Sequence, residues 1–115
     1  MNLMHTSDIK HRKWEEAVRS LGCIITGDPV CVIHHPLGRS GKHNKVRIGG
    51  WLVLPLREDY HVHTDYSVHG NKKRFIEENG RQCDMFKSVI ELHMDKFGTH
   101  PVPPEVIDAI MDWGK

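Results

Sequence analysis

This sequence has few cysteines, and their spacing is not that of a cysteine-rich site. The three cysteines, Cys23, Cys31 and Cys83, include no CxxC pair. This number and spacing exclude a disulfide framework and a zinc site with four thiolate ligands. A reducing compartment is therefore expected, and we predict a cytoplasmic protein.

An excess of charge and a long apolar run are also missing. The 16 Lys and Arg and the 15 Asp and Glu leave a net charge of +1, so no overall positive field indicates a nucleic-acid partner. No apolar run approaches the length of a transmembrane helix, about 20 residues. The first ten residues carry charged side chains rather than an apolar signal core. The length of 115 residues predicts a single domain, 1–115.

Histidine is the residue in excess, with ten copies. A neutral imidazole is a common metal ligand, and it titrates near neutral pH, so a histidine-rich domain suggests metal ligation or proton transfer. Composition alone favours the simpler interpretation of ten scattered surface histidines. The positions of the histidines in the sequence therefore have to distinguish between these two interpretations.

The apolar pattern predicts a helix, a hairpin and further helices. The first helix is expected from Ser7 or Asp8 to Leu21. Two β-prone runs, 23–25 and 30–33, flank Thr-Gly-Asp-Pro and predict a β-hairpin. The fold class is α+β with a small β element.

The remaining segments are a basic, glycine-rich loop, an extended run and three helices. The loop is expected over 37–50, the extended run over 51–56, and the helices over 71–79, 81–97 and 104–113. In the helix 81–97, the buried face is expected to hold Phe86, Val89, Ile90 and Met94.

The first candidate for chemistry is His34-His35-Pro36, at the end of the second β-prone run. Neighbouring residues on a strand point to opposite faces, so both histidines serve one site only if the strand bends. Pro36 favours such a bend, because it cannot continue a ladder of hydrogen bonds. We assign His34 to a metal ion and His35 to the attacking water as general base. An exposed pair at a strand end is the alternative.

The second candidate is His61 with His69, eight residues later. Eight residues drift by about 80° around a helix, so the residues between them must form a loop. A metal site needs ligands from distant chain segments, and these histidines would complete the one begun by His34. His63 and Asp65 stay open as substitutes for the third ligand.

Two basic clusters flank the histidines. Lysines and arginines spaced through a glycine-rich backbone can follow phosphates without reading bases, although such clusters are often only solvated surface. Their position beside the histidines favours nucleic acid over a small molecule as substrate. The predicted DNA-binding residues are Arg39, Lys42, Lys45, Arg47, Lys72 and Lys73.

Five pieces of the chain occur in a characteristic order. They are the CIITG run from Cys23, VIHHP at 32–36, LPL at 54–56, His61, and VHGNKKRF at 68–75 followed by Gly80. Their order and spacing resemble the HNH (ββα-metal) endonuclease superfamily, in its branch of phage recombination-enhancement, Ref-like, RecA-dependent nucleases. The resemblance covers about residues 22–98.

The resemblance implies a small ββα-metal core over 22–98, a short β-hairpin and flanking helices at 1–21 and 99–115. It implies His34, His61 and His69 as metal ligands and His35 as general base. The cofactor would be a divalent ion, Mg²⁺ or Mn²⁺, with Zn²⁺ or Ni²⁺ as an inhibitory occupant. DNA is the implied substrate, in a bacterial or phage-encoded protein, and the RecA filament is a candidate partner.

Within residues 22–98, the sequence departs from the family at two places. The four cysteines of a structural zinc site correspond here to Cys23, Thr26, Arg57 and Tyr60, so we predict no structural zinc. The asparagine of the HNH name has no clear counterpart, because Trp51 and Leu52 stand near its place and Asn44 lies upstream. How the base would be held is therefore open.

The sequence thus predicts a metal-dependent DNA endonuclease that hydrolyses phosphodiester bonds, in a phage or prophage recombination context. The first alternative is a metal-binding or DNA-binding module that keeps the fold without catalysis. The second is a small helical interaction protein whose histidines are incidental.

Overall fold

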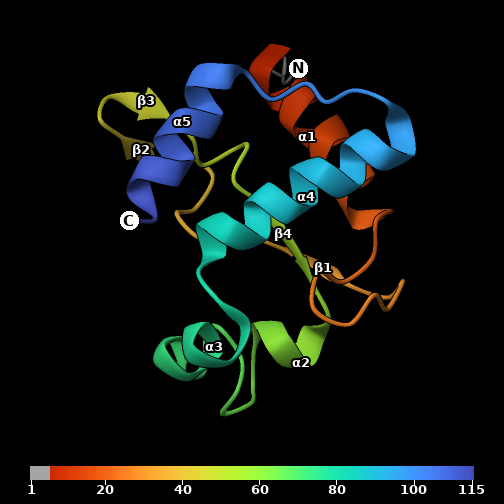
Figure 1. Ribbon diagram of the computed structural model, residues 1–115, viewed down its shortest axis with the longest axis vertical. Coiled ribbons are helices and arrows are strands. Elements are labelled where there is room, and N and C mark those ends of the chain that lie inside the picture. Colours follow the sequence, from red (N-terminus) through yellow and green to blue (C-terminus); the bar gives the residue numbers. More distant parts are fainter. Residues whose placement is uncertain (1–5) are drawn as a thin grey trace, which may run out of the picture.

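The computed structural model describes residues 6–115, which form five helices and two antiparallel pairs of strands (Figure 1). The helices are α1 (Thr6–Arg19), α2 (Glu58–His61), α3 (Lys72–Asn79), α4 (Gln82–Phe97) and α5 (Pro104–Trp113). The strands are β1 (Val32–His34), β2 (Lys42–His43), β3 (Val46–Arg47) and β4 (Leu54–Leu56). The predicted α+β class is confirmed.

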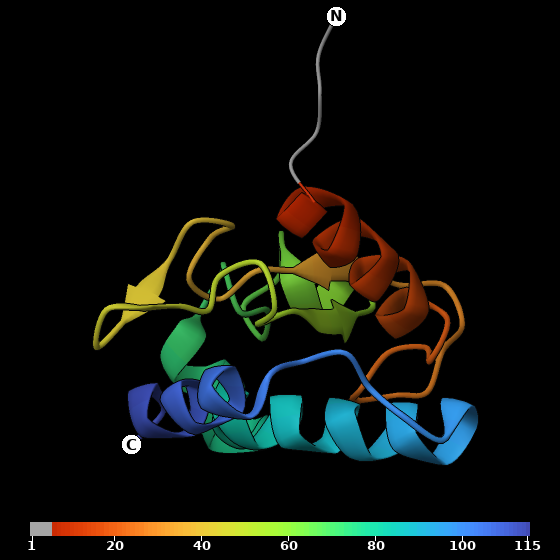
Figure 2. The same cartoon turned by 90° about the horizontal axis from the view of Figure 1, so that it is seen from above.

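Strands β1 and β4 form the central antiparallel pair. Val32 is opposite Leu56, and His34 is opposite Leu54. Helix α1 contacts both strands and α4 contacts β4, so the pair lies between these two helices (Figure 2). All three residues of β4 are buried, and the extended run predicted over 51–56 forms a strand only over 54–56.

The predicted hairpin on either side of Thr-Gly-Asp-Pro is wrong. The segment after Cys23 closes on itself, because the Gly27 N–H donates to the Cys23 carbonyl and the Cys23 N–H donates to the Asp28 carbonyl, both at 2.8 Å. These local bonds leave no extended run to pair with β1. The Ile24 N–H instead donates to the Pro55 carbonyl of β4 at 2.8 Å.

The predicted loop at 37–50 contains a hairpin that the sequence did not indicate. Strands β2 and β3 pair across a two-residue turn at Asn44 and Lys45, whose φ angles are +49° and +68°. Two positive φ values are typical of the tight turns that join hairpin strands. The turn is tethered to α5, since His43 Nε2 and Asn44 Nδ2 lie 2.8 and 3.1 Å from Asp112 Oδ2.

The predicted helix ends are largely confirmed, because local signals set them. Asn71 caps α3 by accepting from the Arg74 N–H, Gly98 ends α4 in the left-handed region, and Pro104 opens α5. Helix α1 ends at Arg19 rather than Leu21, because the Leu21 N–H donates to the Val18 carbonyl three residues back, in a tighter turn.

The core lies between α1, α4 and the central strands. Trp14 of α1 is buried against Phe86 of α4, with ring centroids 6.5 Å apart. Phe86 and Val89 are buried as predicted, but Met94 is 41% exposed. His93 takes the place expected for Met94, because it lies seven residues from Phe86 and so returns to the same face of the helix.

Within residues 6–115, we find no helix that combines the length and the apolar character needed to cross a membrane.

Candidate metal centre

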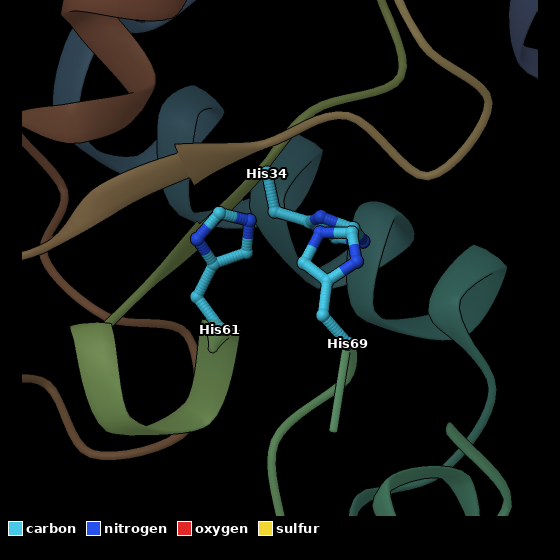
Figure 3. A group of neighbouring side chains, drawn as sticks. All are labelled: His34, His61 and His69. Atoms are coloured by element: carbon cyan, nitrogen blue, oxygen red, sulfur yellow. The ribbon is translucent and has the colours of Figure 1, made fainter. Parts of the chain in front are cut away.

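Three histidines from separate segments converge on one point. His34 ends β1, His61 is the last residue of α2, and His69 lies in the turn before α3, with the three side chains pointing toward one another (Figure 3). One nitrogen from each ring lies within 4.8 Å of the others. The ring centroids are 4.7 to 5.1 Å apart. This spacing allows one ion to reach all three imidazoles.

The loop between α2 and α3 holds His69 beside His61. The Val68 N–H donates to the Tyr60 carbonyl at 2.8 Å, and the His69 N–H donates to the His61 carbonyl at 3.1 Å. The buried Ser67 hydroxyl braces the turn by accepting from the Gly70 N–H at 2.9 Å. The backbone therefore aligns the two histidines across a loop, as their eight-residue spacing requires.

His34 is the buried member of the cluster, with 3% of its surface exposed. Its Nε2 lies 3.0 Å from Oε1 of Gln82, the first residue of α4, so Nε2 carries the proton and donates. Its Nδ1 is buried without a hydrogen-bond partner. Burial is the main cause that lowers the pKa of His34 to about 4. The hydrogen bond to Gln82 acts in the opposite direction, and repulsion from His61 and His69 lowers the pKa further.

The orphaned Nδ1 is the feature that a metal ion would explain. A buried polar atom without a partner is rare, and a neutral imidazole has a lone pair to offer at that atom. Metal-bound histidines commonly donate their other ring N–H to a fixed acceptor, which is the role that Gln82 fills for His34. The donor set therefore fits a divalent ion.

The cluster opens toward solvent on one side. His61 is half-buried, and burial and the neighbouring His69 both lower its pKa. His69 is exposed. Three protein ligands with an open side are typical of a catalytic metal site, whereas a structural zinc site is usually closed by four.

His35 follows the cluster residue His34 directly in the chain, and α1 holds its ring. Its Nε2 is 2.7 Å from Oε1 of Glu15 on α1, and the same carboxylate oxygen accepts from Arg39 Nη1 at 2.7 Å. The side chains of His35 and Glu15 are 15% and 11% exposed.

The two histidines of the second candidate lie at the ends of the loop predicted between them. His61 ends the short helix α2, and His69 lies just before α3. The reason is that Asn71, which caps α3, delays the helix until after His69. Of the alternatives for the third position, His63 is exposed and Asp65 pairs with Arg74 at 2.9 Å, so neither joins the cluster.

The predicted DNA-binding residues lie in three places. Arg39 and Arg47 face a groove beside α1. Lys42 and Lys45 belong to the β2–β3 hairpin, next to α5. Lys72 and Lys73 form the first turn of α3, just after His69. Their role in binding DNA stays a prediction.

Sequence reasoning missed Glu15 and Gln82, which hold the two central histidines. Glu15 could have been suspected from its position beside Trp14, because a carboxylate next to the buried stripe of a helix needs a partner. Gln82 carries no such signal in the sequence. Comparison with protein-family models, with curated proteins and with solved structures finds no match.

Proposed function

We propose that this chain is a metal-dependent DNA endonuclease of the HNH (ββα-metal) class. The observation that carries the proposal is the convergence of His34, His61 and His69, with the orphaned Nδ1 of His34 among them. The position of His35, held by a carboxylate beside this cluster, supports a hydrolytic role. An accidental grouping of histidines would explain neither the bond that His34 donates to Gln82 nor the bond that His35 donates to Glu15.

The arrangement of elements supports the proposed class. Ligands come from the end of β1 and from the α2 region that follows its antiparallel partner β4, so two strands and a helix supply the site. The arrangement differs from a simple ββα unit, because the segment between the strands contains the β2–β3 hairpin and a loop separates α2 from α3. The Ref-like branch is proposed from the sequence resemblance alone.

The first departure from the family, the lost zinc ligands, has a structural counterpart. Where the family carries a structural zinc, Cys23 lies close to Arg57, whose backbone N–H donates to the Cys23 sulfur at 3.2 Å. Burial raises the pKa of the Cys23 thiol, but hydrogen bonds from Thr26, Arg57 and Ile25 outweigh it and lower the value. Hydrogen bonds thus hold together the turn that a zinc ion would otherwise hold.

In the proposed reaction, His34, His61 and His69 would hold a divalent ion. Such an ion supplies positive charge that offsets the charge developing on the phosphate and on the leaving oxygen. Imidazole ligands favour Mn²⁺ and later metals over Mg²⁺, so Zn²⁺ or Ni²⁺ could occupy the site tightly.

His35 acts as the base in this scheme. Glu15 accepts from Nε2–H, which keeps the proton on that nitrogen and leaves the Nδ1 lone pair to take a proton from water. The water oxygen forms a bond to phosphorus as the bond from phosphorus to the 3′ oxygen breaks, and the leaving oxygen takes a proton from solvent. Glu15 thereby fills the positioning role that the missing asparagine left open.

The first prediction concerns the activity itself. Purified protein is expected to nick supercoiled plasmid when Mg²⁺ or Mn²⁺ is supplied and to stop when EDTA is added, because the three imidazoles cannot stabilise a dianionic phosphorane alone. The measurement is gel separation of supercoiled, nicked and linear plasmid, with Ni²⁺ and Zn²⁺ tested in parallel.

Two results would contradict this prediction in different ways. One bound ion per chain without cleavage under any metal would assign the chain to the non-catalytic metal-binding alternative. If metal analysis finds no bound ion and the plasmid assay shows no cleavage, the histidines would be incidental, as in a small interaction protein.

The second prediction concerns Gln82. The variant Gln82→Leu is expected to weaken binding of Mn²⁺ about 10–100-fold, because the ring of His34 loses the acceptor that fixes its tautomer and orientation. Isothermal titration calorimetry measures the Kd. Gln82→Glu, which keeps an acceptor oxygen at the same distance along the side chain, is the matched control and should retain binding. An unchanged Kd in Gln82→Leu would remove the assigned role.

A further inference from the structure

A groove runs between α1 and the segment 38–51. It consists of two adjoining hollows of about 360 and 310 Å³, which share Asp8, His11, Arg39 and Gly50 in their walls. Arg12 and Glu15 complete the first hollow, and Arg47, Ser40 and Trp51 complete the second. The groove thus continues past Glu15, which holds His35.

At the floor of the groove, α1 packs closely on the loop around Gly50 and Trp51. The ring of His11 meets the edge of the Trp51 ring, with centroids 4.7 Å apart. A side chain on Gly50 would overlap the His11 ring, so only glycine allows α1 to approach so closely. This packing sets how closely α1 approaches the loop on the other side of the groove.

The groove carries a small excess of positive charge. Three guanidinium groups, those of Arg12, Arg39 and Arg47, line it together with the carboxylates of Asp8 and Glu15. Glu15 is engaged by His35 and Arg39, whereas among residues 8–115 neither Arg12 nor Arg47 has a carboxylate within 4 Å. Burial is the main cause that lowers the pKa of His11, so its ring adds no charge at neutral pH. Two guanidinium groups are therefore left for an anion.

We propose that this groove binds the sugar–phosphate backbone of the DNA strand beside the bond that is cut, an inference that rests on the proposed nuclease function. Guanidinium groups bind phosphate in a forked, two-bond geometry that fits a backbone better than a point charge does. Arg39 joins the groove to the site, because the oxygen of Glu15 that it contacts also accepts from His35. A DNA strand bound in this groove would run past His35, the proposed general base.

The groove also divides the predicted DNA-binding residues. Arg39 and Arg47 lie in it, and Arg12, which the sequence did not single out, joins them from α1. Lys72 and Lys73 lie beyond His69 on α3 and do not line it. Helix α1, outside the segment 22–98 that carries the resemblance, therefore becomes part of the DNA-binding surface.

The test measures DNA binding without turnover. Full-length protein in EDTA is titrated into fluorescein-labelled single-stranded and duplex oligonucleotides, and anisotropy gives Kd across a range of salt concentrations. Arg12→Ala and Arg47→Ala are each expected to weaken binding roughly threefold to tenfold at low salt. Each should also reduce the slope of log Kd against log salt by about 0.7 on single strands or about 0.9 on duplex, the value for one lost phosphate contact.

The control is Lys13→Ala, which removes the same charge from an exposed position on α1 that does not line the groove. It should leave the slope unchanged. All three variants are expected to fold, because Arg12, Arg47 and Lys13 are exposed. Circular dichroism melts check this.

The possible outcomes test the groove proposal independently of the proposed nuclease function. Slopes of Arg12→Ala and Arg47→Ala equal to that of Lys13→Ala, or no binding of DNA by the unmodified protein, would overturn the groove even if the plasmid is nicked. Reduced slopes in both arginine variants would support the groove even if no metal gives cleavage, in which case the nuclease function fails alone.

Discussion

Replacing His35 by alanine is expected to lower the rate of DNA cleavage by about 10²–10⁴-fold, the usual contribution of a general base. The ring of His35 is the group beside the cluster that is held by a carboxylate and free at its second nitrogen to accept a proton. Binding of Mn²⁺ and DNA should persist, because His34 keeps its own bond to Gln82. Single-turnover cleavage of a labelled duplex measures the loss.

Two further variants make this result specific. His63→Ala removes an exposed histidine outside the cluster and should cleave at the normal rate. Glu15→Gln keeps an oxygen that can accept from His35 but loses the charge that favours one tautomer, so kcat should fall less than in His35→Ala while KM stays near its normal value. Full activity of His35→Ala would remove the base assignment.

The helices could be predicted from the sequence because their boundaries depend on nearby residues. Asn71, Gly98 and Pro104 act within one turn of the helix that each begins or ends. The buried stripe of α4 followed from spacing as far as Val89. It failed at Met94, because His93 turns inward and satisfies its Nδ1 with the Thr99 carbonyl at 2.6 Å. A bond to a later loop is not visible in a periodic pattern.

The strands could not be paired from the sequence, because pairing is a choice between distant segments. The run after Cys23 has β-prone residues, but the bonds across Gly27 and Asp28 close it into a turn. The partner of β1 is β4, whose paired residues lie 20 to 24 positions later in the chain and are all buried. Local propensity decided neither of these outcomes.

The three histidines of the site could be predicted from the sequence, but the residues that hold the histidines in place could not. His34, His61 and His69 could be named because their residue type and order carry the chemistry, and the structure brings them together. The residues that orient the histidines come from α1 and α4, which the motif does not include. A hydrogen bond over 48 residues, as between His34 and Gln82, depends on the whole fold.

Replacing His34 by alanine is expected to have the largest effect on the metal site, with a loss of at least about 100-fold in the affinity for Mn²⁺. His34 is the ligand whose lone pair is already buried and unpartnered, so no rearrangement of water is needed for it to bind. His69 is exposed, and a water molecule can occupy its position, so His69→Ala should lose less. Calorimetric titration of each variant measures the difference.

Thermal unfolding gives an independent measure of the same site. A ligand at 100 times its Kd stabilises the folded state by about 2.7 kcal/mol, so Mn²⁺ should raise the Tm of the unmodified protein and of the control His63→Ala. His34→Ala should show no such rise, even though removing a buried ring lowers its starting Tm. A rise in Tm equal to that of the unmodified protein would mean that the ion binds elsewhere. The three histidines would then be neighbours without a shared ligand, and the proposed nuclease would lose its metal.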